Sequence, residues 1–234
     1  MCGIIGYVGK KQAVPVLLYG LQRLEYRGYD SAGIAVIEPK ENKIIVEKQI
    51  GKIKDLQEKL WNKKIEGNVG IGHSRWATHG APTIENAHPH TSRSEIISIV
   101  HNGIIENYLE LKKELEKKGY KFKSETDTEV IAHLLEDEYN GNLFETALKV
   151  AKKLEGAYAV GIISSKEPDK IVAIKKGSPL VIGLGKDENF IASDIPAVLE
   201  YTKDFIVLDD GEVAVITKDK VEVFDLGGNK KEKQ

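Results

Sequence analysis

The order of strand-like and helix-like segments is the feature that most limits what this chain can fold into. Period-two and apolar segments typical of strands form an early and a late block, and amphipathic helices are bunched between the two blocks. Regular alternation of one strand with one helix, the pattern of a parallel sheet, is missing. The sequence therefore predicts a layered α+β fold in which two sheets stack face to face and helices cover the outer faces.

The segment boundaries follow from apolar periodicity and from turn residues. We expect strands at residues 3–9, 33–38, 43–50, 69–75, 96–101, 157–164, 170–176, 180–184, 189–192, 205–208, 212–217 and 220–225, and helices at 12–25, 54–61, 106–118, 127–139 and 143–154. Thr126 and Glu129 have the spacing of a capping box. Residues 1–226 are expected to form one domain, and residues 227–234, which start with Gly227-Gly228, a linker or disordered tail.

Composition excludes several classes of protein. The net charge of −2 offers no field that would hold nucleic acid or an anionic membrane. No apolar run approaches the roughly 20 residues that cross a bilayer, and no signal segment is recognisable. A single cysteine rules out an internal disulfide and suits a reducing compartment, so we expect a cytoplasmic protein.

That single cysteine is Cys2, directly after Met1. Removal of Met1 makes Cys2 the N-terminus, where a thiol and a free amine lie on adjacent carbons. Their reference pKa values of about 8.5 and 7.7–8.0 leave a reactive fraction of each near neutral pH. Cys2 is therefore a candidate nucleophile that carries its own base. The alternative is a buried strand cysteine that happens to come second.

Two polar loops follow apolar strands and supply further candidates. In Gly72-His73-Ser74-Arg75-Trp76-Ala77-Thr78-His79-Gly80, an arginine at a strand end can hold a carboxylate through two parallel hydrogen bonds, and the tryptophan either packs under the loop or covers a pocket. In His101-Asn102-Gly103, the Asn-Gly pair forms either a hairpin turn or a pair of donors for an oxyanion. Such a donor is worth roughly 3–4 kcal/mol in well-studied hydrolases.

In two other segments, the candidate residues have either a structural or a functional role. Arg27 and Gly28 either line a pocket or belong to a turn before residue 33. Asp127 either favours the helix dipole, by about 0.3–1 kcal/mol, or faces the ammonium group of a ligand. A metal site is an alternative, because five of the histidines lie close together, at positions 73, 79, 88, 90 and 101. Their spacing matches no zinc pattern, and we expect no metal and no cofactor.

Taken in order, the segments CGIIGYVG, LEYRGYDSAGIAV, GHSRWATHG, HPH, VHNGIIENY and SETDTE resemble the class II glutamine amidotransferases. Within that class the chain is similar to the glutaminase half of the glutamine–fructose-6-phosphate aminotransferases, and the similarity extends from Cys2 to about residue 225. The resemblance implies a four-layer αββα fold of the N-terminal nucleophile hydrolase type, with two mainly antiparallel sheets between helical layers.

The resemblance also implies a role for each candidate residue. Cys2 corresponds to the nucleophile, and Asn102 with Gly103 to the oxyanion hole. Arg75 corresponds to the ligand of the glutamine α-carboxylate and Asp127 to that of its α-ammonium group. The remaining matches are Trp76, Thr78 and His79 in a loop over bound glutamine, with Trp76 as a gate for ammonia, and Arg27 and Gly28 beside the nucleophile.

The function implied is hydrolysis of L-glutamine to L-glutamate and ammonia through a γ-glutamyl thioester. In the full-length aminotransferases, two sugar-isomerase domains bind fructose 6-phosphate, which ammonia converts to glucosamine 6-phosphate, and the resemblance implies a homodimer for the full-length form. The 234 residues leave no room for those domains, so an excised domain or a stand-alone glutaminase is expected. The alternatives are an amidase for another amide and a catalytically silent glutamine-binding module.

Overall fold

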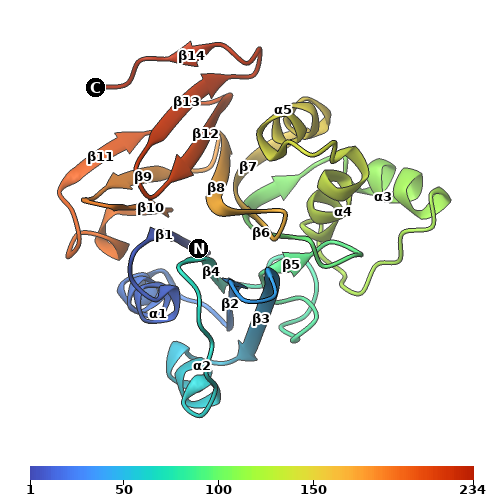
Figure 1. Ribbon diagram of the computed structural model, residues 1–234. Helices are drawn as coiled ribbons and strands as arrows, with labels where there is room; N and C mark the ends of the chain where they lie inside the picture. The colour runs from blue at the N-terminus through green and yellow to red at the C-terminus, as the bar shows by residue number, and fades with distance from the viewer.

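A computed structural model describes the whole chain, residues 1–234, as two stacked sheets flanked by helices (Figure 1). The first sheet has seven strands, and all neighbouring strands in it are antiparallel. In the order in which they pair, its strands are β11 (Asp204–Val207), β9 (Val181–Leu184), β10 (Glu188–Ala192), β1 (Gly3–Gly9), β4 (Val69–Arg75), β2 (Ser31–Glu38) and β3 (Lys43–Ile50). The N-terminal strand thus lies in the middle of its sheet.

The second sheet also has seven strands with antiparallel neighbours. In pairing order they are β14 (Lys230–Lys231), β13 (Val221–Asp225), β12 (Glu212–Thr217), β8 (Glu167–Lys176), β7 (Gly156–Ser164), β6 (Ile97–Ile105) and β5 (His90–Thr91). The helices are α1 (Ala13–Arg23), α2 (Ile53–Leu60), α3 (Tyr108–Lys117), α4 (Glu129–Glu138) and α5 (Leu143–Lys153), with short 3₁₀ turns at Glu25–Arg27 and Ile195–Ala197.

Strand β1 shows why the layers stack as they do. Successive side chains of a strand point to opposite faces of a sheet. Ile4 and Val8 pack into the hydrophobic core between the two sheets, and Ile5 and Tyr7 pack into the core under α1. Because both faces of β1 are covered, the strand is apolar throughout, unlike a strand with one face in water.

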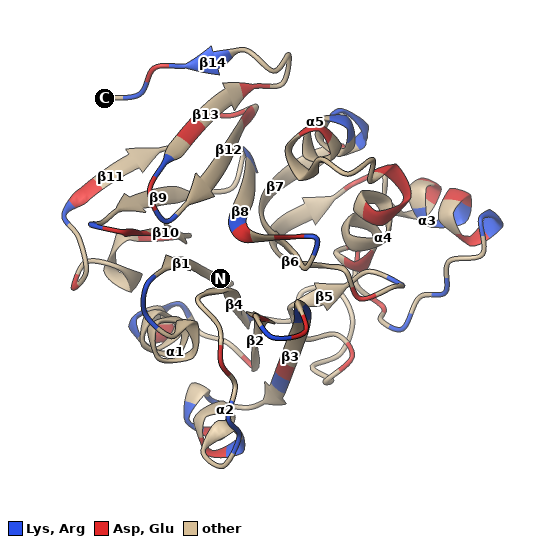
Figure 2. Ribbon diagram, in the orientation of Figure 1, with Lys and Arg blue, Asp and Glu red and all other residues tan.

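Three hydrophobic cores separate the four layers. One contains residues of α1, α2 and the first sheet, a second lies between the sheets, and the third contains residues of the second sheet and of α3, α4 and α5. Figure 2 shows charged residues gathered on the helices and outer strands, whereas β1, β6 and β7 carry none. This arrangement confirms the predicted αββα sandwich. No helix is long and apolar enough to span a bilayer.

The C-terminal residues differ from the expected linker or disordered tail. Gly228 lies in a turn closed by hydrogen bonds to Asp225, and Lys230–Lys231 pairs with β13. The Lys233 ammonium group then forms ion pairs with Asp209 at 2.7 Å and Glu212 at 2.8 Å. Lysine-rich ends usually fray, but here the Lys233 charge meets carboxylates on β12 and on the turn before it, a long-range contact that composition does not reveal.

The capping box predicted from Thr126 and Glu129 is wrong. Helix α4 begins at Glu129, and its N-cap residue, Thr128, makes no side-chain capping bond. The Glu129 carboxylate instead accepts hydrogen bonds from the backbone of Lys123 and from the backbone and hydroxyl of Ser124. Glu129 therefore closes the turn that precedes α4, which holds residues 124–128 in a fixed loop.

Candidate active site

Cys2 lies at the start of the central strand β1 and faces the loop after β4. The backbone N–H of Trp76 donates to Cys2 Sγ at 3.3 Å, and the thiol donates to the Trp76 carbonyl at 3.7 Å. Burial raises the pKa of the Cys2 thiol, and the hydrogen bond from Trp76 opposes that shift. No histidine nitrogen is hydrogen-bonded to Cys2 Sγ, so the thiol has no imidazole base.

A small cavity of about 40 Å³ opens beside Cys2 and collects most of the residues selected from the sequence. Its lining consists of Cys2, Arg75, Trp76, Thr78, His79, His88, His101, Gly103, Thr126, Asp127 and Thr128. These residues come from the position just before β1, from β4 and β6, and from the loops after β4 and before α4. The fold therefore brings together side chains that lie more than a hundred positions apart in sequence, as the N-terminal nucleophile reading requires.

Arg75 supplies the positive charge of the cavity. It ends β4 and is 4% exposed. Its guanidinium group donates to three carbonyl groups of the following loop, those of His79, Gly80 and Ala81. These acceptors are neutral. A carboxylate in the same place would form shorter, charge-assisted bonds with the same donors.

Asp127 supplies the negative charge. Its Oδ2 accepts the backbone N–H of Ile105 at 2.8 Å, and the side chain is 8% exposed. The hydrogen bond ties the carboxylate to the end of β6 rather than to the first N–H groups of α4. The helix-dipole reading of Asp127 thus loses its support, and Oδ1, which has no hydrogen-bond partner in the protein, is free for a ligand.

Asn102 lies next to Cys2 although it does not line the cavity. Its Nδ2 donates to the Cys2 carbonyl at 3.0 Å, and its Oδ1 lies 2.9 Å from His73 Nε2. Strand β6 continues through Asn102 and Gly103 to Ile105. The Asn-Gly pair therefore forms no hairpin turn. It lies inside a strand that pairs with β7.

The backbone conformation at position 103 requires glycine, so a larger residue there should destabilise the protein. Its φ is +117°, and an added Cβ would lie 2.0 Å from the Ala157 carbonyl oxygen. We expect Gly103→Ala to lower the free energy of unfolding by about 2–5 kcal/mol, because unfavourable φ costs about 1–2 kcal/mol and overpacking about 1–3 kcal/mol. Urea denaturation followed by circular dichroism measures the change.

Gly119 is the matched control for this variant. It also has a positive φ, +87°, but no heavy atom lies within 4 Å of an added Cβ. Gly119→Ala should therefore show the backbone cost alone, about 1–2 kcal/mol. Equal losses of stability in the two variants would contradict the proposed clash with Ala157.

Arg27 and Gly28 lie near the N-terminus but outside the cavity lining. Arg27 donates to Ser193 Oγ at 3.0 Å and to Met1 Sδ at 3.0 Å, while its carbonyl accepts a hydrogen bond from the Met1 ammonium group at 2.9 Å. Gly28 has a φ of +75° and faces the Trp76 ring. Trp76 is 51% exposed and covers the site only in part.

Four buried histidines surround this site, and the sequence reading considered them only as metal ligands. They are His73, His88, His90 and His101. Burial lowers the pKa of each, that of His73 to about 3, so the rings are neutral. The His73 and His88 rings stack at 4.0 Å with an angle of 10° between them. Lone pairs in parallel stacked rings do not converge on one ion.

The sequence pattern did not predict that buried histidines and the threonines before α4 form part of the cavity wall. His101 Nδ1 lies 2.8 Å from Thr128 Oγ1, and His90 Nε2 lies 3.2 Å from Thr126 Oγ1. The sequence does indicate that these polar residues, which flank buried strands, need hydrogen-bond partners. Which partners they find depends on the packing of α4 against β5 and β6, which the sequence does not give.

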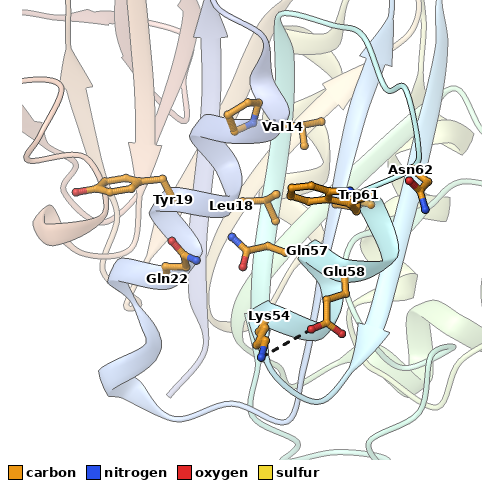
Figure 3. A pocket seen from close by; sticks show the side chains of 11 residues that line it. Val14, Leu18, Tyr19, Gln22, Lys54, Gln57, Glu58, Trp61 and Asn62 are labelled. Atoms are coloured by element: carbon orange, nitrogen blue, oxygen red, sulfur yellow. Dashed lines mark ion pairs between the residues drawn. The ribbon is translucent and has the colours of Figure 1, made fainter.

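A larger cavity, of about 730 Å³, lies between α1 and α2 on the outer side of the first sheet (Figure 3). The exposed ring of Trp61 and the side chains of Leu18 and Val14 line it, and Lys54 and Glu58 form an ion pair at 3.8 Å there. None of the candidate site residues lines this cavity. Of these two cavities, only the smaller one is lined by candidate site residues.

The αββα sandwich with a cysteine at the start of its central strand is the fold of the N-terminal nucleophile hydrolases. The chain aligns with the solved glutamine phosphoribosylpyrophosphate amidotransferase from B. subtilis with a TM-score of 0.84 and 28% identity, over 98% of this chain and 50% of that one. A second structure, described as the allosteric regulatory enzyme of purine biosynthesis, matches with a TM-score of 0.84, 29% identity and coverage of 96% and 49%.

Residues 73–200 match the family model described as the glutamine amidotransferase domain, and the chain belongs to this family. Curated relatives include the glutamine–fructose-6-phosphate aminotransferases of Aquifex aeolicus, 59% identical, and of Clostridium tetani, 54% identical, each over 228 residues. The match covers 97% of this chain but only 38% and 37% of those relatives. The chain thus spans under two fifths of their length.

Proposed function

We propose that this chain hydrolyses L-glutamine to L-glutamate and ammonia through a γ-glutamyl thioester on Cys2. One observation carries the proposal: the thiol of Cys2, the guanidinium of Arg75 and the carboxylate of Asp127 line one cavity. A nucleophile between opposite charges suits an amino acid whose side-chain amide is attacked while its carboxylate and ammonium groups are held. We propose that residues 1–226 form this glutaminase domain.

The reaction begins when Met1 has been removed and the Cys2 amine is free. The amine takes the thiol proton, and the thiolate attacks the side-chain amide carbon. The resulting oxyanion accepts hydrogen bonds from Asn102 Nδ2 and the Gly103 N–H. The C–N bond then breaks, the amine returns its proton to the leaving group, and ammonia departs. Water adds to the thioester, which releases glutamate and restores the thiol.

The α-amine is the best available base. His73 Nε2 is occupied by two oxygen acceptors, the carbonyl of His101 and the Asn102 side chain. Neither ring nitrogen of His88 or His101 contacts the thiol. A terminal amine has a reference pKa of about 7.7–8.0, close to neutral pH, where a general base works best.

Binding of glutamine requires the loop after β4 to move. The cavity of about 40 Å³ is too small for an amino acid, and the loop carbonyls of residues 79–81 occupy the Arg75 donors. We propose that the α-carboxylate replaces these carbonyls, that the α-ammonium group pairs with Asp127 Oδ1, and that Trp76, Thr78 and His79 close over the substrate. Trp76 then separates the thiol from solvent and gates the passage of ammonia.

The longer relatives suggest a role for the released ammonia. By their name they aminate fructose 6-phosphate. We propose that this chain supplies ammonia for that reaction when sugar-isomerase domains are joined to it, giving glucosamine 6-phosphate, and that the full-length form is a homodimer. A cytoplasmic location is proposed from the single unpaired thiol at the site.

A substrate comparison tests the proposal. The purified chain, shown by mass spectrometry to lack Met1, is incubated with L-glutamine or N-acetyl-L-glutamine, and the free acid is measured. We expect kcat/KM for L-glutamine to be about 100-fold higher, because the acetyl group removes the charge that Asp127 pairs with, and a lost buried charge pair costs about 2–5 kcal/mol. An acid-quenched reaction should show the acyl-enzyme mass on Cys2.

Other outcomes would decide against this function. Equal hydrolysis of both compounds would indicate an amidase that does not read the amino-acid end of its substrate. Tight binding of L-glutamine without any glutamate would indicate a binding module. If the folded, processed chain neither binds nor hydrolyses L-glutamine, the proposed glutaminase function is wrong.

A further inference from the structure

We propose that His73 is a positioning residue that orients the Asn102 carboxamide toward the oxygen of the amide carbonyl group that Cys2 attacks. The inference rests on the proposed glutaminase function and adds a residue that the reaction scheme above does not use. His73 lies on β4, and Asn102 lies on β6 of the other sheet. Their contact therefore joins the two sheets next to Cys2, whose carbonyl accepts a hydrogen bond from Asn102.

The geometry fixes the tautomer of His73. Its Nε2 lies 2.9 Å from Asn102 Oδ1 and 3.1 Å from the His101 carbonyl oxygen. The backbone oxygen is an acceptor only, so a hydrogen on Nε2 is required. This N–H is shared between the two oxygens, and His73 acts as a donor to the asparagine.

The same contact fixes which way the carboxamide points. With Oδ1 toward His73, Nδ2 donates to the Cys2 carbonyl at 3.0 Å. The flipped amide would place two acceptors, Oδ1 and the Cys2 oxygen, against each other, and two donors at His73. Only one of the two Nδ2 hydrogens is used by Cys2. The second remains available for an oxyanion formed at the thiol.

The surroundings keep His73 in place and neutral. Its ring is fully buried and stacks on His88 at 4.0 Å. Burial lowers the pKa of His73 to about 3, so the ring stays a neutral donor over the whole range in which an enzyme would work. Its other nitrogen, Nδ1, is buried without a partner. A ring held in this way has little reason to rotate, and the amide that it binds is held as well.

Two substitutions separate the hydrogen bond from the packing. His73→Phe keeps a flat ring that can stack on His88 but removes the donor. His73→Gln places an amide N–H close to the former Nε2 and restores the donor without the ring. We expect His73→Phe to lower kcat for L-glutamine about 10- to 100-fold with little change in KM, and His73→Gln to recover most of that loss. Asn102→Ala, which removes the donor itself, sets the limit at about 100- to 1000-fold.

Alkylation of Cys2 by iodoacetamide provides a readout that a merely structural role would not give. Displacement of iodide forms no oxyanion, so its rate depends on the thiolate and on access but not on Asn102. His73→Phe should therefore react with iodoacetamide at the wild-type rate while glutamine hydrolysis falls. A parallel loss of both rates, or equal activity in the Phe and Gln variants, would overturn the proposal.

A measurement without substrate keeps this inference separate from the proposed function. The side-chain amide of Asn102 gives an NMR signal that can be assigned by comparison with the Asn102→Ala spectrum. We expect it to shift in His73→Phe and to return toward its original position in His73→Gln. If the signal shifts in this way but the protein has no glutaminase activity, the contact between His73 and Asn102 is supported and the proposed reaction is wrong. If the signal does not change and the protein is active, the proposed role of His73 is wrong and the proposed function stands.

Discussion

Replacement of Cys2 by alanine is expected to lower glutamine hydrolysis about a million-fold, the size of effect seen when a nucleophile is removed from a covalent hydrolase. Without the thiol no thioester forms, and the oxyanion donors have no tetrahedral intermediate to stabilise. The rate of glutamate release from the purified, processed chain measures the effect. It should fall below detection, and the acyl-enzyme mass should disappear.

The same variant should keep its fold. The hydrogen bonds of Cys2 Sγ are to the backbone of Trp76 alone, and the side chain is only partly buried. We expect the free energy of unfolding to change by no more than about 1 kcal/mol, the usual worth of one such bond. Cys2→Ser is the matched variant that retains a hydrogen-bonding group, and it should be almost as inactive. Residual activity within tenfold of wild type in either variant would contradict thioester chemistry at Cys2.

Much of the layered architecture could be predicted from the sequence, because apolar periodicity marks most strands and helices. Strands β1, β4 and β12 have the expected bounds, and β3 does too. The order of elements favoured two stacked sheets without excluding other packings, and the structure has this arrangement. Strand β6 was expected to end at His101, but it continues to Ile105, because pairing with β7 overrides the turn preference of Asn102-Gly103.

The features that the sequence did not reveal depend on long-range contacts. Strand β5 has only two residues and is held by its pairing with β6. The partner of Glu129 lies in the preceding turn rather than in the helix that the capping-box pattern describes. The contact of His73 with Asn102 crosses between sheets, so no local spacing predicts it. Candidate residues could be selected from their chemistry, whereas their hydrogen-bond partners required the fold.

The second large effect is expected from the N-terminus itself. While Met1 is attached, the Cys2 nitrogen belongs to a peptide bond and cannot take a proton from the thiol. The Met1 ammonium group and sulfur both contact Arg27, at 2.9 Å and 3.0 Å, so the uncut residue has a defined place beside the site. A chain with a blocked Cys2 amine should be about 100- to 10,000-fold less active, the range that a positioned base contributes.

One fusion protein allows this comparison within a single preparation. A leader peptide that a protease removes directly before Cys2 replaces Met1, and glutaminase activity is measured before and after cleavage. After cleavage the rate should rise with pH as the Cys2 amine loses its proton, because the base acts only when it is unprotonated. A parallel fusion of Cys2→Ala should stay inactive after cleavage. Equal activity of the cut and uncut forms would mean that another group takes the proton, and the buried, neutral imidazoles around the thiol offer no such group in this arrangement.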